Sequence, residues 1–171
     1  MKLSNGLLPC VVGLSLLGCG GKPAVTQSQT ESKPVMGEYL LATEPAGAMA
    51  VGVAKKDAAN DSKVTVVGRI GGSEKPFVDG IAAFTIVDPK VEHCKPDEGC
   101  PTPWDYCCTT DQLPGNMAMV KVVDAQGKAI AQDARAVLGV KELSMVVVQG
   151  SAKRDAEGNL TLLAEKVYVR R

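Results

Sequence analysis

Residues 63–70 read KVTVVGRI. Two sets of side chains alternate along this stretch, and a similar alternation recurs in later segments of the chain. One phase of this stretch is formed by Val64, Val66, Gly68 and Ile70. Because successive side chains of a strand point to opposite faces, the pattern predicts a strand that buries one side. Gly68 stands in the buried phase, where a residue without Cβ allows a strand to bend sharply.

Further segments with related patterns follow on the C-terminal side. Strands are predicted over 81–88, 117–124, 145–153 and 160–170, and a short helical turn over 133–141. Residues 145–153 repeat the alternation of 63–70, with Gly150 in the place of Gly68. The last strand changes phase along its length, which predicts a β-bulge near Glu165. Between the last two strands, Gly158 suits a hairpin loop because glycine readily takes positive φ.

The order of strand, strand, strand, short helix, strand, strand resembles the OB-fold, in particular its versions in anticodon-binding-like domains and small periplasmic proteins. The likeness is carried by VTVVGRI (64–70), AAFTIVD (82–88), KEL (141–143), VVVQGSAKRD (146–155) and LTLLAEKVYVR (160–170). It implies a mainly β domain over 63–171, built as a five-stranded barrel with one short helix. A neutral β-sandwich of similar length is the alternative.

Two segments precede this domain. Residues 36–62 form a pre-barrel segment in which we expect a short strand over 38–43 and a small Ala-rich helix over 48–59. Residues 19–35 are polar and small and contain two prolines, with too little apolar surface to offset the entropy of ordering them. They are predicted to form a flexible tether.

The N-terminus has the features of an export signal. A lysine at the start precedes an apolar run over 6–18 that is too short to span a bilayer as a helix. It ends in Leu16-Leu17-Gly18-Cys19, which resembles the lipobox of bacterial lipoproteins. The resemblance implies a signal peptide over 1–18, lipidation of Cys19 and a permanent membrane anchor. An ordinary cleaved leader is the alternative.

The same resemblance predicts the location of the protein. The chain is expected in the bacterial cell envelope, lipid-anchored and facing the periplasm or the cell exterior. Glycine rather than aspartate follows Cys19, which favours the outer membrane by similarity to known sorting rules.

A segment rich in cysteine, residues 90–116, interrupts the strand pattern. Within it lies HCKPDEGCPTPWDYCC, which holds His93, Cys94, Cys100, Cys107 and Cys108. In an oxidising compartment the four cysteines predict two disulfides, with Cys94 and Cys100 each bonded to one of the vicinal pair. A zinc or copper site formed by His93 and the four thiolates is the first alternative. Redox activity of the vicinal pair is the second.

Composition limits what the barrel is expected to bind. Nineteen basic and nineteen acidic residues leave the net charge at zero, and only 4% of residues are aromatic. Single-stranded nucleic acid is usually bound by a basic groove with aromatic stacking platforms, so nucleic acid is not an expected partner. The candidate contact surface comprises Trp104, Tyr106, Thr85 and Lys121.

These observations lead to three functional hypotheses. The favoured one is a non-catalytic binding or envelope-structural module that contacts an unknown protein or polymer of the cell envelope and needs no cofactor. The second is a metal-binding or thiol-redox protein. The third is binding of oligonucleotides or oligosaccharides on the usual OB ligand face. No catalytic motif stands out, so an enzyme is not expected.

Overall fold

A computed structural model describes residues 37–171 of the chain. The predicted signal peptide, the tether and Cys19 lie outside the described residues. Within the described part, no helix has both the length and the apolar character needed to cross a membrane.

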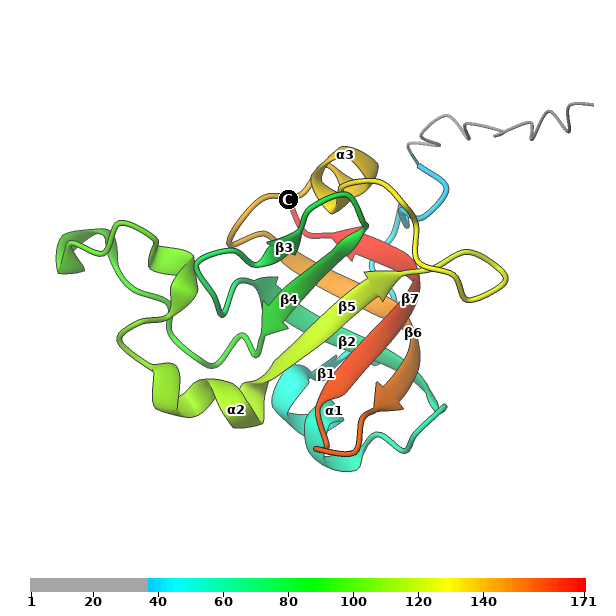
Figure 1. Cartoon of the computed structure of the whole chain (residues 1–171), viewed down its shortest axis with the longest axis horizontal. Helices are drawn as coiled ribbons and strands as arrows, with labels where there is room; N and C mark the ends of the chain where they lie inside the picture. Colours follow the sequence, from blue (N-terminus) through cyan, green and yellow to red (C-terminus); the bar gives the residue numbers. More distant parts are fainter. Residues whose placement is uncertain (1–36) are drawn as a thin grey trace, which may run out of the picture. The chain divides into compact units, whose positions relative to one another are not determined.

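Five strands close into a barrel (Figure 1). They are β2 (Lys63–Ile70), β4 (Ala83–Val87), β5 (Met117–Val122), β6 (Met145–Arg154) and β7 (Leu160–Val169). The hydrogen-bonded order is β2, β6, β7, β5, β4, and β4 pairs back onto β2 to complete the circuit. All of these pairs are antiparallel except β5 with β7, which is parallel.

This arrangement confirms the predicted OB-like barrel with its short helix. Helix α3 (Ala134–Leu138) lies between β5 and β6 in the chain. Its N-cap is Asp133, whose carboxylate accepts the N–H of Arg135, and it ends at Gly139 in the left-handed region. The core lies inside the barrel, where Ile70, Phe84, Ile86, Val120 and Leu162 have no exposed surface.

The two glycines of the repeated pattern lie where backbone and side chains approach closely. A Cβ at Gly150 would overlap the backbone carbonyl of Leu163 on β7, and one at Gly68 would lie 2.9 Å from Ile86. The pairing of β6 with β7 shifts register beside Gly150, which leaves Glu165 as the extra residue of a bulge. The predicted bulge is therefore confirmed.

The pre-barrel segment differs from its prediction. Strand β1 (Met49–Ala50) pairs in parallel with β2, so helix α1 (Val51–Asp57) begins later than expected. The strand predicted over 38–43 is reduced to one isolated bridge between Leu40 and Val167. The side chains of Val51 and Ala54 on helix α1 are buried in the barrel core, so the helix covers part of the core.

One further contact fixes this segment. The buried carboxylate of Asp88 accepts the backbone N–H of Gly52 at 2.7 Å, which satisfies a donor of the first turn of α1. A two-residue strand, β3 (Phe77–Val78), extends the sheet beside β4.

Replacing Gly150 by Ala should destabilise the protein by about 3 kcal/mol, because the new Cβ collides with backbone that belongs to the neighbouring strand. Chemical denaturation of the two proteins measures this difference. Gly115→Ala is the matched control, since a Cβ there meets nothing within 4 Å. Equal loss of stability in both variants would contradict the close-approach argument.

Candidate metal centre

The cysteines lie in the segment between β4 and β5, as predicted. Short turns divide this insert: η1 (Pro96–Glu98), η2 (Pro103–Asp105), η3 (Thr110–Gln112) and α2 (Leu113–Asn116). Proline occupies one of the first two positions of η1, η2 and α2, where its missing N–H has little cost. The insert is therefore a series of fixed turns rather than a regular element.

These turns bring the cysteines together from three places in the insert. Gly99, at φ +71°, ends η1 and leads into Cys100. Tyr106, at φ +59°, ends η2 and turns the chain into the vicinal pair. Asp105 supports this second turn by accepting the N–H of Cys107 at 2.8 Å. The backbone N–H of Cys94 is bonded to the carbonyl of Pro103 at 3.2 Å, which holds the first cysteine beside the turn.

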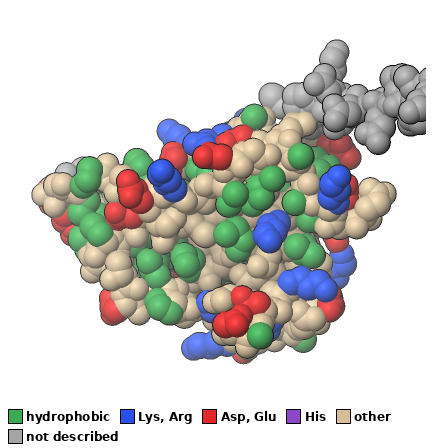
Figure 2. Space-filling view, in the orientation of Figure 1, with side chains coloured by type: hydrophobic (Ala, Val, Ile, Leu, Met, Phe, Trp, Pro, Cys, Tyr) green, Lys and Arg blue, Asp and Glu red, His purple; other side chains and the backbone are tan. Residues whose placement is uncertain are grey.

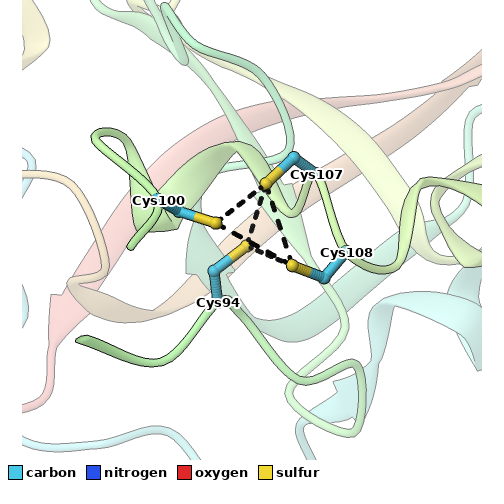
Figure 3. Close-up of side chains that lie close together, drawn as sticks. All are labelled: Cys94, Cys100, Cys107 and Cys108. Atoms are coloured by element: carbon cyan, nitrogen blue, oxygen red, sulfur yellow. Dashed lines mark hydrogen bonds between the residues drawn. The ribbon is translucent and has the colours of Figure 1, made fainter. Parts of the chain in front are cut away.

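The four thiols converge on one point (Figure 3). The Sγ atom of Cys94 lies 3.3 Å from that of Cys107 and 3.4 Å from that of Cys108. The Sγ of Cys100 lies 3.2 Å and 3.9 Å from the same two atoms. The vicinal sulfurs are 3.9 Å apart, and all four atoms lie within 4.8 Å of one another.

These separations, from 3.2 Å to within 4.8 Å, bracket those of a tetrahedral metal site. Four thiolates around Zn²⁺ at about 2.3 Å stand about 3.8 Å apart along the edges of the tetrahedron. A disulfide needs an S–S distance of about 2.05 Å, and the shortest separation among the four described cysteines is 3.2 Å. The two disulfides thus stay a prediction, while the arrangement has the size of a metal-binding group.

The thiols differ in how readily they ionise. Burial opposes ionisation of Cys94, but hydrogen bonds from the backbone of Cys108 and from the neighbouring thiols outweigh it and lower its pKa. Donation to the sulfur of Cys94 raises the pKa of Cys108 to about 11. Hydrogen bonding to Cys107 and Cys94 likewise raises the pKa of Cys100. The buried cysteine is therefore the first thiolate of the group.

The surroundings of the group are acidic. The insert has two lysines but five carboxylates, namely Glu92, Asp97, Glu98, Asp105 and Asp111. The thiol of Cys108 lies 3.8 Å from a carboxylate oxygen of Glu98. Negative charge at this place favours a bound cation over a bound anion.

His93 does not join the group. Among the described residues, the ligand atoms that cluster are the four sulfurs alone. The Nδ1 of His93 instead accepts from the guanidinium of Arg69 on β2, at 3.3 Å, and its ring lies 6.3 Å from that of Tyr106. Burial, followed by the charge of Arg69, lowers the pKa of His93. Arg69 was not predicted to contact His93, because the alternation over residues 63–70 places its side chain only on the face of the strand opposite Val64 and Val66.

The predicted contact surface is only partly exposed. Tyr106 is fully buried in a second apolar cluster with Val87, Val91 and Leu113, so it packs the insert onto the barrel and is not a contact residue. Trp104 is half-buried: its Nε1–H donates to the carbonyl of Glu74 at 3.0 Å, and its own carbonyl accepts the N–H of Gly72. The insert is thereby bonded to the loop that follows β2.

The remaining candidates, Thr85 and Lys121, lie on neighbouring strands β4 and β5. The hydroxyl of Thr85 donates to the carbonyl of Gly71 at 2.6 Å. Phe84, the one aromatic residue of these two strands, is buried. Lysine and arginine side chains are scattered over the visible face and form no continuous basic stripe (Figure 2). Among the described residues, β4 and β5 thus present no exposed aromatic side chain on which a base could stack.

The chain matches no protein-family model, and no curated protein matches it in sequence. Among solved structures it is similar to a protein described as an aspartyl-tRNA synthetase from Leishmania major Friedlin, with 10% identity over 75% of this chain and a TM-score of 0.40. It is also similar to Rim1, a mitochondrial single-stranded DNA binding protein from S. cerevisiae, with 15% identity over 66% of this chain and a TM-score of 0.32.

Both likenesses concern the fold and are weak. The chain spans 21% of the length of the synthetase and 98% of that of Rim1. At these TM-scores neither likeness tells what this chain binds. The class assignment therefore follows from the barrel itself, which is that of an OB-fold protein with a four-cysteine insert.

Tyr106→Phe should leave the free energy of unfolding unchanged or raise it by up to about 1 kcal/mol, because the buried hydroxyl has no hydrogen-bond partner. Tyr106→Ala should cost about 3–5 kcal/mol, because it empties the centre of the second apolar cluster. Denaturant titration of both variants tests this pair. A large loss of stability in the phenylalanine variant would show that the hydroxyl makes an essential bond.

Proposed function

We propose that this protein binds a metal ion through Cys94, Cys100, Cys107 and Cys108, with the OB barrel as a non-catalytic scaffold. The observation that carries the proposal is the convergence of four sulfur atoms within 4.8 Å. Soft thiolate ligands in a tetrahedral arrangement favour zinc or an iron–sulfur centre among biological metals. Four sulfurs around one point favour a single zinc ion.

Zinc also fits the absence of a free coordination position. Structural zinc sites use four protein ligands, whereas catalytic ones keep a position for water or substrate. With all four positions taken by cysteines, the metal would hold the insert in shape and leave no place for a reacting water. This supports a binding or structural module over an enzyme. Cu(I) binds the same kind of ligand and is the competing ion.

Full-length protein purified under reducing conditions should contain about one zinc ion per chain by elemental analysis. Cobalt should replace zinc and produce the absorption of tetrahedral thiolate coordination. Cys100→Ser should lower zinc affinity by at least about 10-fold, since it removes one of four ligands. Loss of affinity is measured by competition with a chelator of known strength.

His93→Gln is the matched control, because this residue neighbours Cys94 in sequence but its ring faces Arg69. Its zinc affinity should equal that of the unchanged protein. If the His93 variant loses metal as strongly as the cysteine variant, the site has a different ligand set. Protein that never takes up a thiophilic metal in reducing buffer overturns the proposal.

The N-terminal motif supports a proposal for where in the cell this protein lies. We propose that the chain is an exported lipoprotein, anchored through Cys19 and displayed in the bacterial envelope, where it contacts an envelope protein or polymer. The support is the order Leu16-Leu17-Gly18-Cys19 directly after an apolar run. Attached acyl chains contribute about 0.8 kcal/mol for each buried CH₂, so two or more make a stable anchor.

Cys19→Ser should shift the protein from the detergent phase to the aqueous phase in a phase-partition assay of bacterial cells. The mass of the unchanged mature protein should correspond to a chain that begins at Cys19 and bears acyl groups. Cys10→Ser is the control, since that residue lies inside the predicted signal peptide. Equal partition of all three proteins would exclude a lipid anchor on Cys19.

A further inference from the structure

We infer that the four-cysteine group is also an oxidation site, in which a small-molecule disulfide converts the thiolates into the bonds Cys94–Cys108 and Cys100–Cys107 and expels the metal. This inference rests on the proposed function for the metal it releases. It goes further in assigning a definite pairing and a reversible chemistry to the same residues.

The geometry selects this pairing among three. Bonding of Cys107 to its neighbour Cys108 is disfavoured, because consecutive Cα atoms stand about 3.8 Å apart and disulfides need about 4.4–6.8 Å. That disfavours the pairing that joins Cys94 to Cys100. Of the two that remain, the proposed one uses sulfur separations of 3.4 and 3.2 Å. The other uses separations of 3.3 and 3.9 Å.

Exposure assigns a role to each thiol. Cys107 and Cys108 are exposed, Cys100 is half-buried, and Cys94 is buried. A disulfide from solution therefore reaches one of the vicinal pair first and forms a mixed disulfide there. Cys94, which no bulky oxidant can reach directly, can only act as the resolving thiol. Each exposed cysteine has a less exposed partner within 3.4 Å that completes the exchange.

The chemistry balances with a named oxidant. Two molecules of oxidised glutathione accept four electrons from the four thiolates and become four molecules of reduced glutathione. Two S–S bonds form in the protein, two S–S bonds of the oxidant break, and four protons from solution are taken up by the glutathione thiolates. The sulfurs lose the negative charge that bound Zn²⁺, so the ion leaves.

The insert keeps its place during this change, because packing holds it independently of the cysteines. Tyr106, Val91 and Leu113 remain buried against Val87 of the barrel. The backbone bond from Gly72 to Trp104 and the indole bond to Glu74 also lie outside the four-cysteine group. The four-cysteine group can therefore alternate between a metal-bound state and a disulfide-bonded state while the rest of the insert stays in place.

The test treats zinc-loaded full-length protein with oxidised glutathione and follows free zinc with a chromogenic chelator. About one equivalent of zinc should appear as two protein disulfides form, and a dithiol reductant should reverse both. Cys107→Ser and Cys108→Ser serve as a matched pair. After oxidation, alkylation and cleavage at Glu98, the first should carry its free thiol on Cys100 and the second on Cys94.

The outcomes separate this inference from the proposed function. Free thiols found the other way round in the two variants, or a Cys107–Cys108 bond in the unchanged protein, overturn the pairing. Zinc that stays bound while the oxidant is in excess overturns the redox chemistry but leaves the metal site intact. Protein that forms the stated disulfides yet never binds zinc supports the pairing and contradicts the proposed function.

Discussion

The close approach of β6 and β7 at Gly150 is the constraint on which the barrel depends. At this point the carbonyl of Leu163 occupies the space that any side chain would need. The bulge at Glu165 lets β7 follow this bend and resume pairing with β6 on the other side. Strand β7 also pairs with β5 in parallel, and β4 pairs back onto β2. The missing Cβ at Gly150 and the extra residue at Glu165 thus accommodate the close approach of β6 and β7 within this closed sheet.

The cysteine group depends on the barrel in the same direct way. Strands β4 and β5 are neighbours in the sheet, so the insert between them must leave and return at one end of the barrel. Val87 and Met117 stand opposite each other at that end and give Tyr106 an apolar surface to pack on. The four thiols converge because the turns around them start from this anchored position. A metal ion bound in this loop would be held by an insert that packs on the barrel, and two of its ligands, Cys107 and Cys108, would be exposed.

The strands and the bulge could be predicted because alternation and glycine position are local properties. The side on which Tyr106 lies could not, since it depends on how the insert folds back onto Val87, Val91 and Leu113. His93 shows the same limit: proximity to Cys94 in sequence suggested a ligand, but Arg69 from strand β2 holds its ring. Helix α1 was predicted too long because the parallel pairing of Met49 with Val66 is a long-range contact. The predicted disulfides and the alternative metal site both require the four sulfurs to converge, but the sequence does not indicate the distances between them.

The bridge at Leu40 also determines how a pull on the chain would enter the barrel. The N–H of Leu41 donates to the carbonyl of Val167, and the N–H of Val167 donates to the carbonyl of Tyr39. Both bonds join β7, the strand that pairs with β6 on one side and β5 on the other. Tension applied N-terminal to Gly37 is therefore borne first by two main-chain bonds to strand β7.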